Sequence, residues 1–235
     1  KYIFNMFESI KKFHLIYNFP KKYPLYKKFI SNIGFVIFGI IIHPRKNLLN
    51  HKDLIKARLL LRKGDVVMCG DLKKASHLII RGPFTHATIY VGRKRFVEAV
   101  QEGVRYTTLH HIFTEYDTLL IMRLPKDVKN RKKKIKKAME VAKKQIGKPY
   151  DFDFSNDADK FFCTELVNYA YKKAKHDTKL ESVSKFKKIE TDLIKKYITA
   201  SHALHPVKFA EDGNFDIIFM SHNLQSHNKI SLKRK

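Results

Sequence analysis

The sequence predicts an α+β fold, a small antiparallel sheet or barrel with helices packed on one side. Three observations lead to this prediction: short apolar segments typical of strands, a glycine-containing hairpin loop between two of them, and long amphipathic segments that follow. Hairpin-paired strands followed by separate helices are typical of α+β proteins. The chain has 235 residues, 44% of them hydrophobic, enough for one well-cored domain and an appendage.

The first part of this fold is expected to consist of one helix and four strands. A helical pattern covers residues 53–61, and short runs rich in Val, Ile, Leu and aromatic residues follow it. The expected strands are residues 64–69, 85–91, 95–100 and 118–124. A last strand is expected at residues 215–220.

Three helices are expected after these strands, at residues 127–146, 159–174 and 190–198. The first has an apolar face made of Ile135, Met139, Ala142 and Ile146. Gly147 and Pro149 follow it in the order that commonly ends a helix. These helices supply the layer that covers the sheet.

Composition divides the chain into three parts. Residues 1–50 form an aromatic, Lys-rich helical extension, residues 51–220 form the compact domain, and residues 221–235 form a basic C-terminal tail. Within the extension, apolar residues recur at helical spacing: Ile3, Phe7, Ile10, Phe13 and Tyr17. Such a stripe either packs against the chain's own domain or lies on a membrane surface.

Residues 29–42 are largely apolar and are flanked by Lys27, Lys28 and Arg45. Their number falls short of the roughly 20 residues that a membrane-spanning helix needs, so no complete span is expected. A buried helix and a membrane-surface helix are both consistent with this segment. The sequence leaves the cellular compartment open.

The chain is strongly basic, with 48 Lys and Arg residues against 22 Asp and Glu residues and a net charge of +26. This charge fits an anionic partner, and it equally fits helices whose exposed faces are simply rich in lysine. No nucleic-acid motif accompanies the charge, so no specific nucleic-acid partner is predicted. An anionic membrane surface, bound through residues 1–50, is kept as a candidate partner.

Two cysteines, Cys69 and Cys163, are too few for a disulfide framework. Cys69 lies in an expected strand and is interpreted as a core residue. Neither cysteine has the CxxC or Cys/His spacing of a metal site, so no metal and no cofactor are expected.

Strand geometry brings a histidine and a glutamate together. If residues 92–94 form a three-residue hairpin loop, Thr88 lies opposite Glu98. His86 and Glu98 then become diagonal neighbours on one face of the sheet, close enough for their side chains to meet. A two-residue loop would place them on opposite faces.

Cys163 lies near the start of the helix expected at residues 159–174, with Asp157 or Asp159 as its capping residue. The helix dipole there favours a thiolate, and a thiolate with a histidine and a carboxylate forms an activated nucleophile. Burial in the core is the alternative interpretation of Cys163, since cysteine is among the most buried residue types. The compatible pair of His86 and Glu98 favours a cysteine hydrolase.

Four segments occur in this order: LRKGDVV (residues 61–67), THATIYVG (85–92), FVEA followed by GV (96–99 and 103–104), and IGKPYDF followed by FCTELV (146–152 and 162–167). Together they resemble the circularly permuted NlpC/papain-like cysteine hydrolases of the YiiX/YebB-like group. The resemblance covers roughly residues 55–175. It implies a papain-like fold in which the histidine precedes the cysteine in the chain.

By that resemblance, Cys163 is the nucleophile, His86 is the general base and Glu98 orients the imidazole. Tyr150 matches the tyrosine that precedes the cysteine, where it lines the substrate pocket or assists the oxyanion.

The implied activity is that of a peptidase or amidase acting through a thioester acyl-enzyme, on cell-wall peptides, conjugated amino acids or another acyl-amide. Two alternatives remain open: a lipid esterase or acyltransferase at a membrane surface, and a catalytically silent basic binding module.

Overall fold

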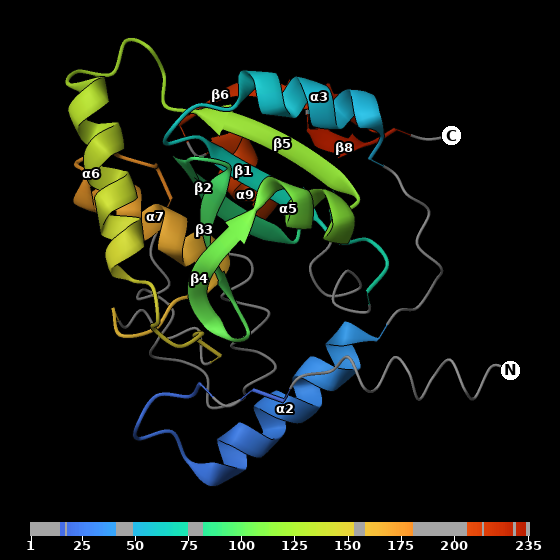
Figure 1. Cartoon of the computed structure of the whole chain (residues 1–235), viewed down its shortest axis with the longest axis vertical. Coiled ribbons are helices and arrows are strands. Elements are labelled where there is room, and N and C mark those ends of the chain that lie inside the picture. Colours follow the sequence, from blue (N-terminus) through green and yellow to red (C-terminus); the bar gives the residue numbers. More distant parts are fainter. Residues whose placement is uncertain are drawn as a thin grey trace, which may run out of the picture.

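The structure is a computed structural model that describes residues 15–16, 18–40, 49–74, 82–152, 158–180, 206–212, 214–227 and 229–233. Six antiparallel strands form its main sheet, in the order β4-β3-β2-β1-β5-β6 (Figure 1). They are β1 (Val66–Gly70), β2 (His86–Gly92), β3 (Arg95–Val100), β4 (Gly103–Thr108), β5 (Thr118–Arg123) and β6 (Asp216–Met220). Strands β4 and β6 are the two edges, so the described sheet is open and is not a barrel.

Six helices and a small hairpin complete the described structure. The helices are α2 (Leu25–Gly39), α3 (His51–Leu60), α5 (Leu109–Glu115), α6 (Arg131–Lys144), α7 (Cys163–Lys173) and α9 (Pro206–Asp212). The hairpin pairs β7 (Leu224–Ser226) with β8 (Ile230–Leu232). No helix in the described part of the chain is long and apolar enough to cross a membrane.

The two longer helices of the domain, α6 and α7, pack on one face of the sheet, as predicted. Their buried residues, such as Ala138, Ala142 and Leu166, join Ala87 and Ile89 of β2 in one apolar cluster. The opposite face is also covered, because Ala57 of α3 and Ile112 of α5 belong to a second cluster, around Phe96 and Leu119. The prediction of helices on one side therefore holds for α6 and α7 but not for α3 and α5.

The predicted strands are confirmed, with ends that differ by one or two residues. Helices α6 and α7 are shorter than predicted and begin at Arg131 and Cys163. Strand β4 and helix α5 were not predicted, because each is short and partly polar. The helix predicted at 190–198 and most of the apolar stripe at 3–17 lie outside the described residues.

The described residues after position 220 pack into the domain and do not form a separate tail. Leu224 of β7 and Ile230 of β8 are buried in the same apolar cluster as α6 and α7. The compact part of the chain therefore extends past residue 220, where the predicted boundary lay.

Candidate active site

Three predicted side chains converge at the start of β2. His86 is the first residue of β2, Glu98 lies in the neighbouring strand β3, and Cys163 is the first residue of α7. The Nε2 atom of His86 lies 3.0 Å from Oε2 of Glu98. The Cys163 side chain is also a hydrogen-bond partner of the His86 imidazole. Because Nε2 of His86 is bonded to Glu98, Nδ1 is the ring nitrogen that remains available to exchange a proton with the Cys163 sulfur.

The meeting of His86 and Glu98 depends on the register of the β2–β3 hairpin. Thr88 pairs with Glu98, as predicted. The predicted three-residue loop is wrong, because Gly92 pairs with Arg95 and the loop consists of two residues, Arg93 and Lys94, both with positive φ.

A bulge in β2 explains why the predicted register is nevertheless correct. Tyr90 pairs with Phe96 and Gly92 pairs with Arg95, so Val91 is an extra residue in β2. A bulge of this kind shifts the pairing by one residue, which has the same effect as one more residue in the loop. His86 and Glu98 therefore stay on the same face.

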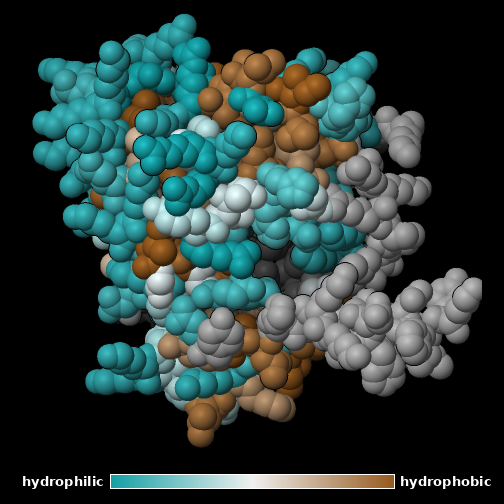
Figure 2. Space-filling model, in the orientation of Figure 1, coloured by the Kyte–Doolittle hydropathy of each residue, from teal (hydrophilic) through white to brown (hydrophobic). Residues whose placement is uncertain are grey.

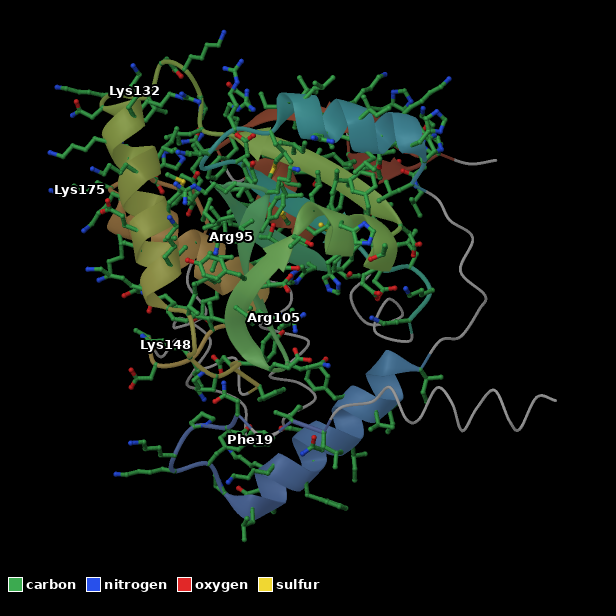
Figure 3. All side chains as sticks on the ribbon, viewed as in Figure 1. Phe19, Arg95, Arg105, Lys132, Lys148 and Lys175 are labelled. Atoms are coloured by element: carbon green, nitrogen blue, oxygen red, sulfur yellow. The ribbon has the colours of Figure 1, made fainter. Side chains whose placement is uncertain are left out.

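Glu98 is fully buried and receives a second cation. Arg105 of β4, labelled in Figure 3, lies directly opposite Glu98 in the β3–β4 register. Its Nε atom is 3.0 Å from Oε1 of Glu98. Burial raises the pKa of Glu98, but His86 and Arg105 together lower it below its usual value. The carboxylate is thus held in its charged form, with one oxygen for each cation.

His86 is held in its protonated form. Burial lowers its pKa, but hydrogen bonds and charges from Cys163 and Glu98 raise it more, so that the pKa is about 9. At neutral pH the ring is therefore an imidazolium between a sulfur and a carboxylate, the arrangement of an activated thiol–imidazole pair.

Tyr116, the residue that follows α5, stacks on the His86 ring. The ring centroids lie 5.4 Å apart and the planes differ by 2°. Burial, and next the charge of Glu98, raises the pKa of Tyr116 well above its usual value, so the phenol stays neutral. The stack fixes the plane of the imidazole, while the bond to Glu98 fixes its rotation.

Helix α7 places the sulfur at its first turn. Its N-cap residue is Phe162, whose N–H donates to the Glu165 carboxylate at 3.3 Å. The prediction of Asp159 as the cap is wrong, since Asp159 lies in a turn three residues before Phe162; Asp157 lies outside the described residues. First-turn N–H groups have no acceptor within their own helix, and that of Cys163 adjoins its own sulfur.

The backbone of Tyr150 pairs with the segment just before Cys163. It forms a parallel bridge with Phe161, two residues before Cys163. Its half-buried ring packs against Phe152 at 5.0 Å and against Phe35 of α2 at 6.2 Å between centroids. Its assignment to the substrate pocket or the oxyanion stays a prediction.

A buried ion pair braces the segment between Tyr150 and Cys163. The Nζ atom of Lys160 lies 3.2 Å from Oδ1 of Asp151, which is fully buried. This ion pair was not predicted from the sequence, nor were the positions of Arg105 and Tyr116 in the site. If a further strand had been predicted after a two-residue loop at residues 101–102, its register would have placed Arg105 opposite Glu98. The residues around Tyr116 give no comparable indication of its contact with His86.

The second cysteine, Cys69, is buried in the sheet as predicted. It pairs with His86 across β1 and β2, and burial raises the pKa of its thiol well above the usual value. Among the described residues, no group of three or more His, Cys, Asp or Glu side chains is placed to hold a metal ion.

The chain is similar to a protein of known structure, the metalloprotein yiiX from Escherichia coli O157:H7. The two share 26% sequence identity over 49% of this chain and 67% of that chain, with a TM-score of 0.43. No curated protein matches the sequence.

The family model for the permuted papain-like amidases, YaeF/YiiX, C92 family, matches residues 60–219. This match confirms the predicted resemblance, and with it the permuted papain-like fold built from helices and an antiparallel sheet. It also confirms an enzyme of the cysteine peptidase or amidase type. The chain therefore belongs to the permuted papain-like amidase family.

Proposed function

We propose that the protein hydrolyses an amide bond through a thioester acyl-enzyme, with Cys163 as nucleophile, His86 as proton carrier and Glu98 as the group that orients His86. The observation that supports this most directly is the His86 imidazole, held between the sulfur of Cys163 and the buried carboxylate of Glu98. No cofactor is needed for this chemistry.

In the acylation half, the sulfur attacks the carbonyl carbon, and the developing oxyanion accepts a hydrogen bond from the N–H of Cys163 at the start of α7. The imidazolium of His86 donates its Nδ1 proton to the leaving nitrogen as the carbon–nitrogen bond breaks. The amine departs, a thioester joins Cys163 to the acyl group, and His86 is neutral.

In the deacylation half, neutral His86 accepts a proton from water, and the resulting hydroxide attacks the thioester carbonyl. The carbon–sulfur bond breaks, the carboxylic acid leaves, and the charged pair of Cys163 and His86 is restored. Glu98 stays ionised throughout and stabilises the imidazolium in both halves.

Selective alkylation tests whether the pair is reactive. With iodoacetamide below pH 8, Cys163 should become labelled while Cys69 stays unmodified, as read by peptide mass spectrometry. Cys69 is a matched control, because it is a free thiol in the same chain and pairs with His86 across the sheet. His86→Ala should abolish the preference for Cys163. Equal, slow labelling of both cysteines would instead favour the catalytically silent binding module.

The bond that is cleaved can be found by trapping the acyl group. The purified protein is incubated with peptide, γ-amide and lipid-ester acyl donors, and the intact mass is measured. A mass increase on Cys163 identifies both the nucleophile and the acyl group. A lipid esterase or acyltransferase is the second candidate, favoured by the exposed apolar face of α2, and an adduct from lipid donors alone would replace the amidase assignment.

A further inference from the structure

Helix α2 presents its apolar side to solvent. Six of its large apolar residues are between 44% and 81% exposed: Leu25, Tyr26, Phe29, Ile30, Ile33 and Ile37. At 100° per residue they fall within an arc of about 140° on one side of the helix. Figure 2 shows apolar surface at the lower end of the molecule, where α2 lies, and a second apolar area at the upper end. We call this arc the α2 face.

The opposite side of α2 is fixed to the protein. Asn32, at the edge of the exposed arc, accepts a hydrogen bond from the N–H of Ile16 at 2.7 Å. The ring of Phe35 packs edge-on against Phe152 at 5.3 Å and against Tyr150. Turning the helix over would therefore break the contacts of Phe35 with Tyr150 and Phe152.

Lysines border the α2 face. Lys21 and Lys22 are exposed just before the helix. Lys27 and Lys28 are half-buried, about 60° beyond the two edges of the arc, with their ammonium groups over the rings of Tyr23 and Phe19. No acidic residue occurs between residues 18 and 40. An apolar stripe bordered by lysines is the pattern of a helix that lies in the interface of an anionic bilayer, with its lysines at the headgroups.

The length of α2 fits this orientation. Its 15 residues extend about 22 Å, less than the roughly 30 Å of a bilayer's hydrocarbon core. A second copy of the chain fits the same face poorly, because pairing two α2 faces would bring lysines of two strongly basic molecules together.

We propose that the α2 face binds the surface of an anionic lipid membrane, with α2 lying in the membrane plane. Phe35, on the inner side of α2, contacts Tyr150 in the segment that leads to the nucleophile helix. Membrane binding therefore holds this end of the active-site region next to the lipid surface, and the partner is recognised by its anionic headgroups and apolar interior together.

Vesicle sedimentation tests this proposal on the whole chain. The protein is mixed with vesicles of phosphatidylcholine alone or of phosphatidylcholine with phosphatidylserine. We expect binding to the anionic vesicles that weakens with added salt. The double variant Phe29→Ser/Ile33→Ser should bind at least about tenfold more weakly, because it removes two large apolar side chains from the face.

The matched control changes two equally exposed residues on α3, at the opposite end of the molecule (Figure 1). Ile55 is 54% exposed and Leu59 78%, against 68% for Phe29 and 44% for Ile33. Ile55→Ser/Leu59→Ser should leave vesicle binding unchanged. All substituted side chains are exposed, so circular dichroism should show the same fold in both variants.

Three results would overturn the proposal: no binding of the unsubstituted chain to anionic vesicles, equal loss in both double variants, or self-association that only Phe29→Ser/Ile33→Ser removes. The last would assign the face to a second copy. Vesicle binding does not depend on the reactivity of Cys163, so the outcome is independent of the proposed amidase chemistry.

Discussion

Cys69 and Cys163 are free, buried thiols that both neighbour His86, yet their surroundings differ. Cys69 lies inside strand β1, fully buried among apolar side chains, and burial disfavours its charged form. Cys163 begins a helix and is a hydrogen-bond partner of the imidazolium. If Cys163 is the nucleophile, as proposed, proximity to a histidine is not what distinguishes it from Cys69. A thiol also needs groups that stabilise its negative charge, here a helix start and a protonated ring.

The largest effect is expected from removing the nucleophile. Cys163→Ala should eliminate amide hydrolysis, because no thioester can form, while the melting temperature stays within a few degrees of the unsubstituted protein. Turnover of the substrate found by acyl trapping and a thermal melt are the two measurements. Residual hydrolysis above background would reassign the nucleophile.

The next largest effects are expected from substituting His86 and then the carboxylate bonded to it, Glu98. His86→Ala should lower kcat/KM by about 10²–10⁴-fold, the usual contribution of an acid–base group. Glu98→Gln should lower it less, since the base remains and only its orientation and charge partner are lost. If Glu98→Gln turned over substrate as fast as the unsubstituted enzyme, its assigned role would be wrong.

The pH dependence of substrate turnover should differ from that of Cys163 alkylation at high pH. The pKa of His86 is raised from 6.5 to about 9, so the imidazolium is present below pH 9 and is lost as the pH rises through that value. Acylation needs this proton for the leaving amine, so kcat/KM should fall above about pH 9, while Cys163 stays reactive towards iodoacetamide. In Glu98→Gln the fall in kcat/KM should begin at lower pH. Parallel pH profiles for the two reactions would contradict this division of roles.

The same shift links His86 to stability. Because its pKa is higher in the folded protein than the ordinary value of 6.5, protonation favours the folded state. This contribution is complete below about pH 6.5 and disappears as the pH passes about 9. Urea unfolding of the unsubstituted protein and of His86→Ala, compared at pH 6 and pH 10, should show a larger difference at pH 6.

A smaller effect is expected from the ring that holds the imidazole plane. Tyr116→Leu keeps an apolar side chain at this position but removes the stacking partner of His86. It should lower kcat about tenfold through less precise placement of the proton carrier. Tyr116→Phe keeps the stack and should retain most of the activity. If both variants lost the same activity, the hydroxyl rather than the stacked ring would be the important group.

The smallest effect is expected at the other thiol. Cys69→Ala should leave kcat/KM unchanged and lower the free energy of unfolding by about 1 kcal/mol, the usual cost of a small change in a packed core. Chemical unfolding and turnover of the same preparation measure both. A large loss of turnover without unfolding would show that Cys69 contributes to the chemistry.

Several features of the site could be predicted from local patterns. The alternation of side chains along residues 85–100 placed His86 and Glu98 on one face, and the register was correct although the loop was not. The predicted loop was one residue too long and the bulge at Val91 was not predicted, so the two errors cancelled in the register. Bulges leave little trace in a sequence, so a register predicted from loop length alone depends on such features.

Arg105 and Tyr116 were missed for different reasons. Arg105 lies seven residues beyond Glu98, and its contact follows once β4 is identified as the next strand. Tyr116 meets His86 from a helix that lies beyond β4, and no spacing rule connects the two positions. Their contact arises only when α5 packs on the sheet face that carries His86.

The sequence by itself determined the α+β class, the strand that carries His86, the face that it shares with Glu98, and the helix that begins near Cys163. These follow from period-two alternation and helical spacing, which act over a few residues. Only the tertiary structure decided that an Arg105–Glu98–His86 chain with a buried carboxylate at its centre and a stacked Tyr116 surround the imidazole, and that α2 turns its apolar side outward. Those features depend on which distant surfaces pack together, and burial, charge and exposure are properties of that packing.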